Sequence, residues 1–441
     1  EGPYPPLCPQ VQAPVWTPTP HNLIDMNETI QLDMLQSAGV GALALVVGMV
    51  MTRKIGWLQR FCIPSPVSGG ILFSIATLLV YQLAHVELTF DPTLKDVFML
   101  AFFTSVGFQS NLRVLRQGGR TLVIMLLLLV CIISMQNLVP LAITSALGVS
   151  PLVGMAAGSI SMAGGHGTAG GFSSVLEHMG LSGAATISMA AATFGLIAGS
   201  MIGGPIAERL IRRRLTSEHM EPKDYTIDPA MAGIESDESL PAGRAKHLST
   251  HEQEFQQYAS ASYALLIVMA LGTLASKALQ LTGITFPTYF GALITAAIVR
   301  NVIEQTPWRR HLEVEKIVSV GNISLSVFLG MAMISLKLWE LETLAVPLVL
   351  ILLVQVLMMI VFTYSVAFNL LGRDYDAAVL VAGICGFGLG ATPNAMANMS
   401  AVCYKYHYSV KPFLIVPIIG AMFVDMINTG IITLFLNWME V

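Results

Sequence analysis

The feature that most constrains this fold is a long stretch without charge. No Asp, Glu, Lys or Arg occurs from Thr121 to Leu176, and over the whole chain 11% of residues are charged whereas 54% are hydrophobic. Soluble domains carry about 25% charged residues. The composition therefore predicts an integral membrane protein, and a surface embedded in lipid gives no reason to expect a nucleic-acid partner.

The apolar stretches divide into two kinds. A membrane-spanning helix needs about 20 mainly apolar residues. Two apolar stretches, 152–179 and 376–404, are unusually rich in Gly, Ala and Ser, and we expect each to be a re-entrant hairpin. The remaining stretches predict an all-α fold with ten transmembrane helices, at 36–52, 64–84, 94–110, 121–147, 184–207, 259–281, 285–303, 317–335, 343–368 and 411–436.

The distribution of Lys and Arg favours hairpins over crossings in those two stretches. Cytoplasmic loops carry an excess of basic residues, which places the basic loop 53–60 in the cytoplasm. If both Gly-rich stretches enter and leave on one side, all but Lys95, Lys277 and Lys337 of the 23 Lys and Arg residues are cytoplasmic. Both termini are then extracytoplasmic. Non-helical backbone at a hairpin tip is tolerated where protein or a water-filled cavity satisfies it.

The two halves of the chain repeat one another. "IPSPVSGGIL" (63–72) matches "FPTYFGALIT" (286–295), and "AGSISMAGGHGTAGG" (157–171) matches "AGICGFGLGATPNA" (382–395). Each half has five spans, an odd number, so the second half enters the membrane with opposite polarity, as in secondary transporters with inverted repeats. The predicted organisation is a Pro-rich extracytoplasmic tail (1–35), a first membrane repeat (36–215), a cytoplasmic linker (216–258) and a second, inverted repeat (259–437).

The two hairpin tips are the candidate substrate site. Glycine lets backbone N–H and C=O groups approach a ligand closely. A half-helix that starts at a tip points its positive end at a carboxylate, and unwound carbonyls can hold a cation. The alternative is close helix packing through small residues. The candidate substrate-binding residues are Gly164, Gly165, His166, Gly167, Thr168, Gly388, Gly390, Ala391, Thr392 and Asn394.

Polar residues inside the spans are candidates for an ion site. Asp425 is a carboxylate deep in an uncharged segment, so it must face the protein interior beside a cation or a donor. We expect it to bind Na⁺ or a substrate ammonium, with a structural hydrogen bond as the alternative. His166 has two possible roles: a neutral imidazole that hydrogen-bonds the tip, or a proton relay. The other candidate Na⁺ ligands or neighbours, for which interhelical hydrogen bonding is the alternative, are Gln136, Asn137, Gln355 and Asn428.

Several motifs resemble the bacterial sodium/glutamate symporter family. They are "GSISMAGGHGTAGGF", "ATFGLIAGSMIGGPIA", "VGNISLSVFLGMAMISLKLWEL", "DYDAAVLVAG" and "GFGLGATPNAMANM", and the resemblance runs from about 36 to 437. It implies Na⁺-coupled glutamate uptake across the bacterial inner membrane, with Na⁺ as coupling ion, no cofactor, and no enzymatic activity. It also implies a homodimer and an elevator-type movement. Carried over by motif, the site includes Gly164–Thr168 and Gly388–Asn394.

Two other functions compete with this interpretation. A Na⁺- or H⁺-coupled di- or tricarboxylate carrier would have the same architecture. An intramembrane hydrolase would use His166 as base and Ser161, Ser173 or Ser174 as nucleophile. The second tip has Leu389 where His166 should be repeated, which catalysis would not explain.

Overall fold

The computed structural model describes residues 28–61, 63–111, 119–215, 250–281, 286–307 and 312–439. Its first half contains β1 (Glu28–Leu32), α1 (Met34–Lys54), α2 (Gly56–Arg60), α3 (Ser65–Ala84), β2 (Val86–Phe90), α4 (Thr93–Gln109), α6 (Gly119–Leu147), α7 (Pro151–Ala156), α8 (Gly165–His178) and α9 (Ala184–Arg214).

The second half follows the same order of helices. It contains α10 (Thr250–Gln280), α11 (Phe290–Ile303), α12 (Val314–Ile334), the 3₁₀ helix η3 (Leu338–Leu344), α13 (Ala345–Phe362), the π-helix η4 (Thr363–Ala367), α14 (Phe368–Leu370), α15 (Tyr375–Leu389), α16 (Thr392–Lys405), α17 (Val410–Ile418), the π-helix η5 (Ile419–Phe423) and α18 (Val424–Met439).

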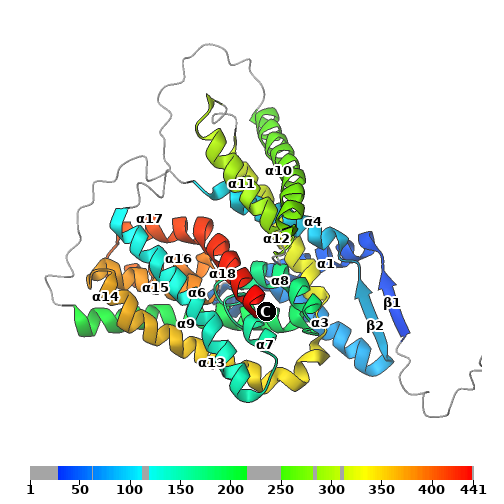
Figure 1. Cartoon of the computed structure of the whole chain (residues 1–441), viewed down its shortest axis with the longest axis horizontal. Helices are drawn as coiled ribbons and strands as arrows, with labels where there is room; N and C mark the ends of the chain where they lie inside the picture. The colour runs from blue at the N-terminus through cyan, green and yellow to red at the C-terminus, as the bar shows by residue number, and fades with distance from the viewer. Residues whose placement is uncertain are drawn as a thin grey trace, which may run out of the picture.

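These helices pack into two groups (Figure 1). The flanking group consists of α1, α3 and α4 together with α10, α11 and α12. The hairpin group consists of α6 to α9 and α13 to α18, and it contains both Gly-rich segments. Every residue of α15 is buried, so this apolar helix lies in protein and not in lipid.

An aromatic cluster joins the two groups. Tyr289, at the start of α11, is fully buried and stacks on Phe103 of α4 with ring centres 3.7 Å apart. Phe172 of α8, in the hairpin group, meets the same ring edge-on at 6.1 Å. The Tyr289 hydroxyl lies 3.5 Å from Thr429 Oγ1 on α18. Since most of this contact is between ring surfaces, little directional bonding ties the groups together at this point.

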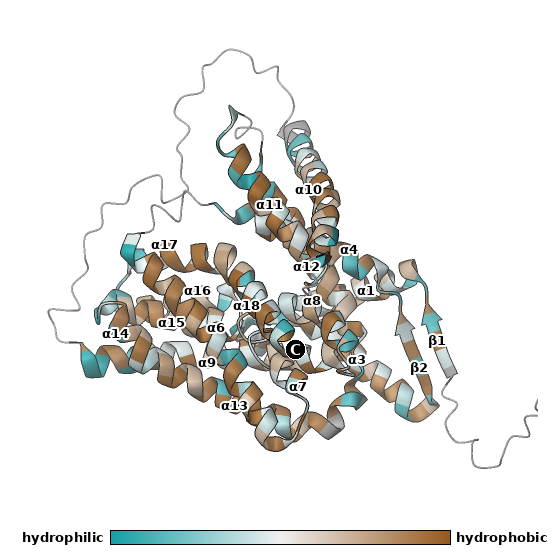
Figure 2. Cartoon of the chain, in the orientation of Figure 1, coloured by the Kyte–Doolittle hydropathy of each residue, from teal (hydrophilic) through white to brown (hydrophobic). Residues whose placement is uncertain are grey.

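Eight helices in the described part of the chain are long and apolar enough to cross a membrane. They are α1, α3, α6, α9, α10, α12, the continuous α13–α14 segment and the continuous α17–α18 segment. Figure 2 shows apolar residues along these helices and hydrophilic residues at the end of α9 beside α14. The other two predicted spans correspond to α4, with 17 residues, and α11, with 14. Ten crossings therefore remain a prediction.

A two-stranded parallel sheet corrects the expectation of an all-α fold. β1 pairs with β2 in the register Glu28↔Val86 to Leu32↔Phe90. Both strands alternate polar with apolar residues, which is typical of a half-buried strand. Ile30, Leu32, Leu88 and Phe90 line an apolar cavity with residues of α1 and α3. This face is covered only in part, because Ile30 remains 52% exposed.

Two expected domain boundaries do not coincide with the ends of helices and strands. The predicted tail 1–35 overlaps β1, and α1 begins at Met34, where Asp33 forms a capping box with Gln36; residues 1–27 lie outside the described part. The predicted linker 216–258 ends earlier, because α10 begins at Thr250. Residues 216–249 of that linker lie outside the described part as well. A helix that continues past its apolar section gives no hydropathy signal at its polar end.

Candidate functional site: a cavity between two helix breaks

The first helix break depends on two glycines. Between α7 and α8 the chain makes a buried turn, closed by a hydrogen bond of 2.9 Å from Gly164 N–H to the Ser159 carbonyl. Gly165 then begins α8 with φ of 57°. A Cβ at this position would lie 2.9 Å from the carbonyl oxygen of Gly390 in the second break. Glycine is therefore required here both for the left-handed backbone and for the contact between tips.

The second helix break brings another helix N-terminus to the same place. α15 ends at Leu389, Gly390 follows in a non-helical conformation, and Ala391 is extended before α16 begins at Thr392. Pro393 lies in the first turn, where its fixed φ suits a helix start and its missing N–H costs nothing. The first backbone N–H groups of α8 and of α16 have no acceptors within their helices. Both ends also carry the positive pole of the helix dipole.

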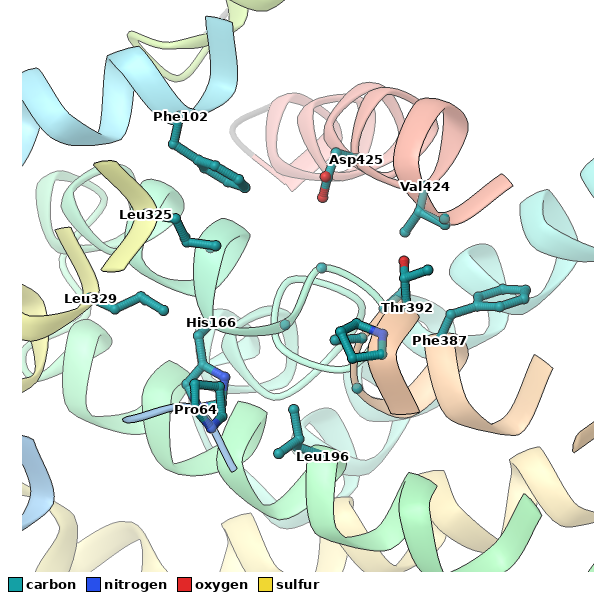
Figure 3. Close-up of a pocket in the computed structure, with 18 residues that line it drawn as sticks. Pro64, Phe102, His166, Leu196, Leu325, Leu329, Phe387, Thr392, Val424 and Asp425 are labelled. Carbon is teal, nitrogen blue, oxygen red and sulfur yellow. The ribbon is translucent and has the colours of Figure 1, made fainter. Parts of the chain in front are cut away.

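The two tips line one cavity of about 220 Å³ (Figure 3). The predicted substrate residues that line it are Gly164, Gly165, His166, Gly167, Gly390, Ala391 and Thr392. Thr168, Gly388 and Asn394 do not line it. They lie behind the tips, where they contact other parts of the hairpin group. Most of the residues predicted to form a shared site at the tips therefore line one cavity.

Asp425 faces this cavity from α18. Figure 3 shows its carboxylate on the opposite side from His166, above Thr392. The Thr168 hydroxyl donates a hydrogen bond of 3.4 Å to Asp425 Oδ1, which connects α18 to the first tip. The π-helix η5 comes directly before α18, and a Cβ on its Gly420 would lie 2.2 Å from Thr392 Oγ1. The π-helix therefore lets α18 pack tightly against the second tip.

His166 is buried and is hydrogen-bonded to a neighbouring helix. Its Nε2 lies 3.0 Å from Thr193 Oγ1, and that hydroxyl donates its own proton to the Met189 carbonyl at 2.9 Å. Thr193 must therefore accept from His166, which assigns the proton to Nε2. Ser161 Oγ donates to the Ala156 and Ser188 carbonyls instead of approaching the imidazole. This arrangement favours a structural imidazole over a catalytic base.

The predicted amides of α6 and α13 lie between the hairpins and do not line the cavity. Gln136 Nε2 donates to the Gly388 carbonyl at 2.6 Å. Gln355 Nε2 donates to the Gln136 carbonyl at 2.8 Å. Asn137 Oδ1 accepts a bond of 3.1 Å from Ser159 N–H. Gln136 and Asn137 therefore satisfy backbone at the two helix breaks, whereas Gln355 bonds a carbonyl within α6.

Two more amides connect one repeat with the other. Asn394 Nδ2 donates to the Leu196 carbonyl of α9 at 2.8 Å, and Asn428 Nδ2 donates to the Ser159 carbonyl at 3.0 Å. The side-chain oxygens of four of these buried amides receive no hydrogen bond from any described residue: Gln136 Oε1, Gln355 Oε1, Asn394 Oδ1 and Asn428 Oδ1. A buried acceptor without a partner costs about 1–3 kcal/mol. Such oxygens suit a cation.

The flanking group contributes a wall that the sequence did not indicate. Pro64, at the start of α3, and Phe102 of α4 line the cavity together with Leu325 and Leu329 of α12. Pro64 lies in a segment matched between the repeats, and Leu325 and Leu329 lie in one of the motifs that resemble the family, but none of the four was a candidate site residue. Apolar residues of a membrane span contact either lipid or protein, so their type did not identify the face that meets the tips.

The charge of the cavity sets what it can bind. Asp425 is its one ionised side chain among the described residues, and no Lys or Arg lines it. Across the described ranges, no group of three or more His, Cys, Asp or Glu side chains could hold a metal ion. An anionic ligand here would depend on backbone N–H groups and hydroxyls. A cation would depend on Asp425 and neutral oxygens.

Comparison with known proteins agrees with this geometry. The model of the family described as sodium/glutamate symporter matches residues 30–408. The chain belongs to the sodium/glutamate symporter family. The sodium/glutamate symporter of Escherichia coli (strain K12) is 37% identical over 407 residues, which cover 92% of this chain and 98% of that protein.

Two other proteins are similar to this chain, to different degrees. The sodium/glutamate symporter of Haemophilus influenzae is 37% identical over 398 residues, covering 90% of this chain and 95% of that protein. Among solved structures, the sodium proton antiporter MjNhaP1 from Methanocaldococcus jannaschii is 14% identical, with a TM-score of 0.40. That alignment covers 91% of this chain and 94% of the antiporter. The family assignment comes from the symporters.

Proposed function

We propose that this chain is a secondary transporter that couples the inward movement of Na⁺ to the uptake of glutamate across the bacterial inner membrane. The supporting observation is its 37% identity with a sodium/glutamate symporter along 92% of the chain. The cavity is consistent with this function, since two helix N-termini and one carboxylate meet in a space of about 220 Å³. No enzymatic step and no cofactor is part of the proposal.

Glutamate is recognised mainly by backbone in this proposal. Its carboxylates bind the N-termini of α8, from Gly165 onward, and of α16, from Thr392 onward. The α8 end supplies the unpaired N–H groups of its first turn, and the α16 end supplies the Thr392 N–H. Both ends carry a positive dipole, as do the half-helices that bind anionic substrates in transporters. Gly164, Gly167, Gly390 and Ala391 allow the close approach. Because no basic side chain lines the cavity, the substrate is released without breaking a strong ion pair.

Na⁺ binds next to the same tips. Asp425 supplies the charge, and Asn428, three residues later on α18, has a buried oxygen without a donor. A second group of oxygens lies between the hairpins at Gln136 and Gln355, close to the Asn137 amide. Cations in discontinuous-helix transporters are held by such oxygens and by unwound carbonyls. Thr168 and Asp425 connect the ion site with the first tip, so binding of one ligand organises the other.

Energetics favour more than one Na⁺ per glutamate. Glutamate carries a net charge of −1, and moving it into a negative interior costs about 2.3 kcal/mol per 100 mV. One Na⁺ only neutralises this charge, whereas two make the step electrically favourable. The two groups of buried oxygens provide room for two ions. A reversal-potential measurement in vesicles that yields one Na⁺ per glutamate would remove this part of the proposal.

Glycines at matching places support two inverted five-span repeats. A Cβ on Gly48 or Gly69 would overlap the facing backbone of α3 or α1, and one on Gly272 or Gly291 would do the same between α10 and α11. The two pairs lie 224 and 222 residues apart in sequence (272 − 48 and 291 − 69). Each half thus has the same tight first helix pair. With ten crossings, re-entrant hairpins and the basic residues inside, both termini are extracytoplasmic.

Transport takes place when the hairpin group moves as a body past the flanking group. The tips, Asp425 and the amides all belong to the hairpin group, whereas Phe102, Leu325 and Leu329 of the flanking group present an apolar wall. A wall without hydrogen bonds to the ligand permits sliding of the elevator type. A homodimer would hold the two flanking groups still, and chemical cross-linking in membranes would detect that dimer.

Uptake into proteoliposomes tests the function directly. Purified protein should accumulate radiolabelled glutamate when Na⁺ is high outside, and should stop when choline replaces Na⁺. Unlabelled glutamate should compete, while citrate and malate should not. Accumulation driven by a proton gradient alone, or competition by citrate but not by glutamate, would instead identify a di- or tricarboxylate carrier and reject the proposal.

A further inference from the structure

A second cavity lies at the far end of the hairpin group, where α9 meets the α14–α15 turn. It has a volume of about 360 Å³ and is lined by Arg214, Phe368, Asn369 and Arg373. Arg214 is the last residue of α9, and Arg373 lies just before α15. Segments far apart in sequence therefore bring two guanidinium groups to one concave site. None of its lining residues belongs to the glutamate cavity.

The arginines of this cavity are oriented but not neutralised. Arg214 lies 4.6 Å above the ring of Tyr364 and donates to Asn369 Oδ1 at 3.4 Å. Neither it nor Arg373 has an ion pair with a carboxylate in the described ranges. Arg212, in the same turn as Arg214, differs because it pairs with Glu208 at 2.9 Å. The cavity thus presents two unpaired positive charges.

An apolar stripe leads along the outer face of α13 to this cavity. Val349, Leu353, Leu357 and Val361 follow one another at intervals of four residues, and each is more than half exposed. The next exposed members of the stripe are Val366 and Leu370. The step from Val361 to Val366 spans five residues instead of four, and it falls at the π-helix η4 (Thr363–Ala367). Since a π turn contains more residues than an α turn, the stripe stays aligned until it reaches the arginines.

We propose that this face binds an anionic phospholipid, with its phosphate between Arg214 and Arg373 and its acyl chains along the stripe on α13. Arginine is well suited to bidentate binding of phosphate, and basic pockets between membrane helices on the cytoplasmic side bind anionic headgroups. Under the topology proposed above the cavity faces the cytoplasmic leaflet. The lipid would then move with the hairpin group and not with the flanking group.

The test uses the full chain, purified and stripped of lipid in a neutral detergent. Phosphatidylglycerol is added while the melting temperature and the lipid adducts seen by native mass spectrometry are recorded. The test variant is Arg214→Gln with Arg373→Gly. Position 373 has φ of 56°, a conformation that glycine adopts without strain. The substitution should therefore not lower the melting temperature of the lipid-free variant through backbone strain. The control, Arg53→Gln with Arg213→Gln, removes the same charge elsewhere.

We expect the wild type and the control to be stabilised by phosphatidylglycerol and the test variant to bind it roughly thirtyfold more weakly, as the loss of two basic contacts to an anionic headgroup implies. Three results would overturn the proposal. The test variant and the control could lose the lipid equally. Phosphatidylcholine could stabilise the wild type as well as phosphatidylglycerol does. Free glycerol phosphate at the same concentration could give the same stabilisation, which would identify a soluble phosphate compound as the ligand.

Discussion

Replacing Gly165 by Ala should disconnect the two tips with little change elsewhere. At φ of 57° an Ala residue is strained, and its Cβ would lie 2.9 Å from the carbonyl oxygen of Gly390. The neighbour is backbone of the other tip, so it can give way only if the tips separate. We therefore expect the backbone strain and the separation of the tips to act at the place where the glutamate carboxylates bind.

The size of the effect follows from the strain. A non-glycine residue held in an unfavourable backbone region costs about 1–3 kcal/mol. If relief requires the tips to open, that energy is lost from binding, and glutamate affinity falls by roughly 5- to 150-fold. The same amount need not unfold a bundle of this size. The melting temperature of the variant should therefore remain close to that of the wild type.

Calorimetric titration with glutamate at saturating Na⁺ measures the change, and Gly204→Ala provides the matched control. Gly204 lies on α9 with open space around its missing Cβ and without a left-handed φ. The control should bind like the wild type. If Gly165→Ala also binds like the wild type while folding normally, the tips are not the binding surface, and the site proposed here is wrong.

Three further results are expected. Asp425→Asn should weaken the apparent affinity for Na⁺ in uptake assays more than it lowers thermal stability; an unchanged Na⁺ dependence would make Asp425 structural. His166→Ala removes one hydrogen bond to Thr193, worth about 0.5–1.5 kcal/mol, so Na⁺-driven uptake should persist within roughly tenfold, and complete loss would indicate a chemical role. Glu87→Gln breaks the 2.7 Å ion pair with Lys337, whose pKa that hydrogen bond raises above 10.5. The partly exposed pair contributes stability below that pKa and loses it above, so the difference in melting temperature should be the same at pH 6 and pH 9 and be lost only as the pH rises through the raised pKa; a difference already lost at pH 9 would contradict this.

The sequence predicted the parts of the site that depend on local backbone chemistry. Glycine at the tip was expected because it lets backbone approach a ligand closely; in the structure Gly165 has φ of 57° and approaches the Gly390 carbonyl of the other tip. Asp425 was expected to face the interior because a charge in lipid is costly, and it lines the cavity. Such requirements apply to one residue and its own neighbours. They can be recognised without knowing how the helices pack.

The parts that the sequence missed depend on packing between distant segments. Phe102 and Leu325 are no different in type from the lipid-facing residues of their own helices, because both surroundings are apolar. The partner of Gln136 is a carbonyl at the end of α15, next to the second helix break, and the partner of Asn394 is a carbonyl within α9. The β1–β2 sheet pairs strands that are separated by three helices, and neither strand has a partner nearby in sequence.

The amide bonds between the repeats also bear on how the chain is made. The carbonyls of Ser159 and Leu196 accept hydrogen bonds from Asn428 and Asn394, which are 269 and 198 residues further along. At synthesis rates of about 5–20 residues per second, roughly 10–50 s pass before these donors emerge. During that interval both carbonyls lack their final side-chain partners, although the Ser159 carbonyl can accept the Gly164 N–H of its own turn. The first repeat therefore completes its hydrogen bonding at these two carbonyls only when the second repeat has been made.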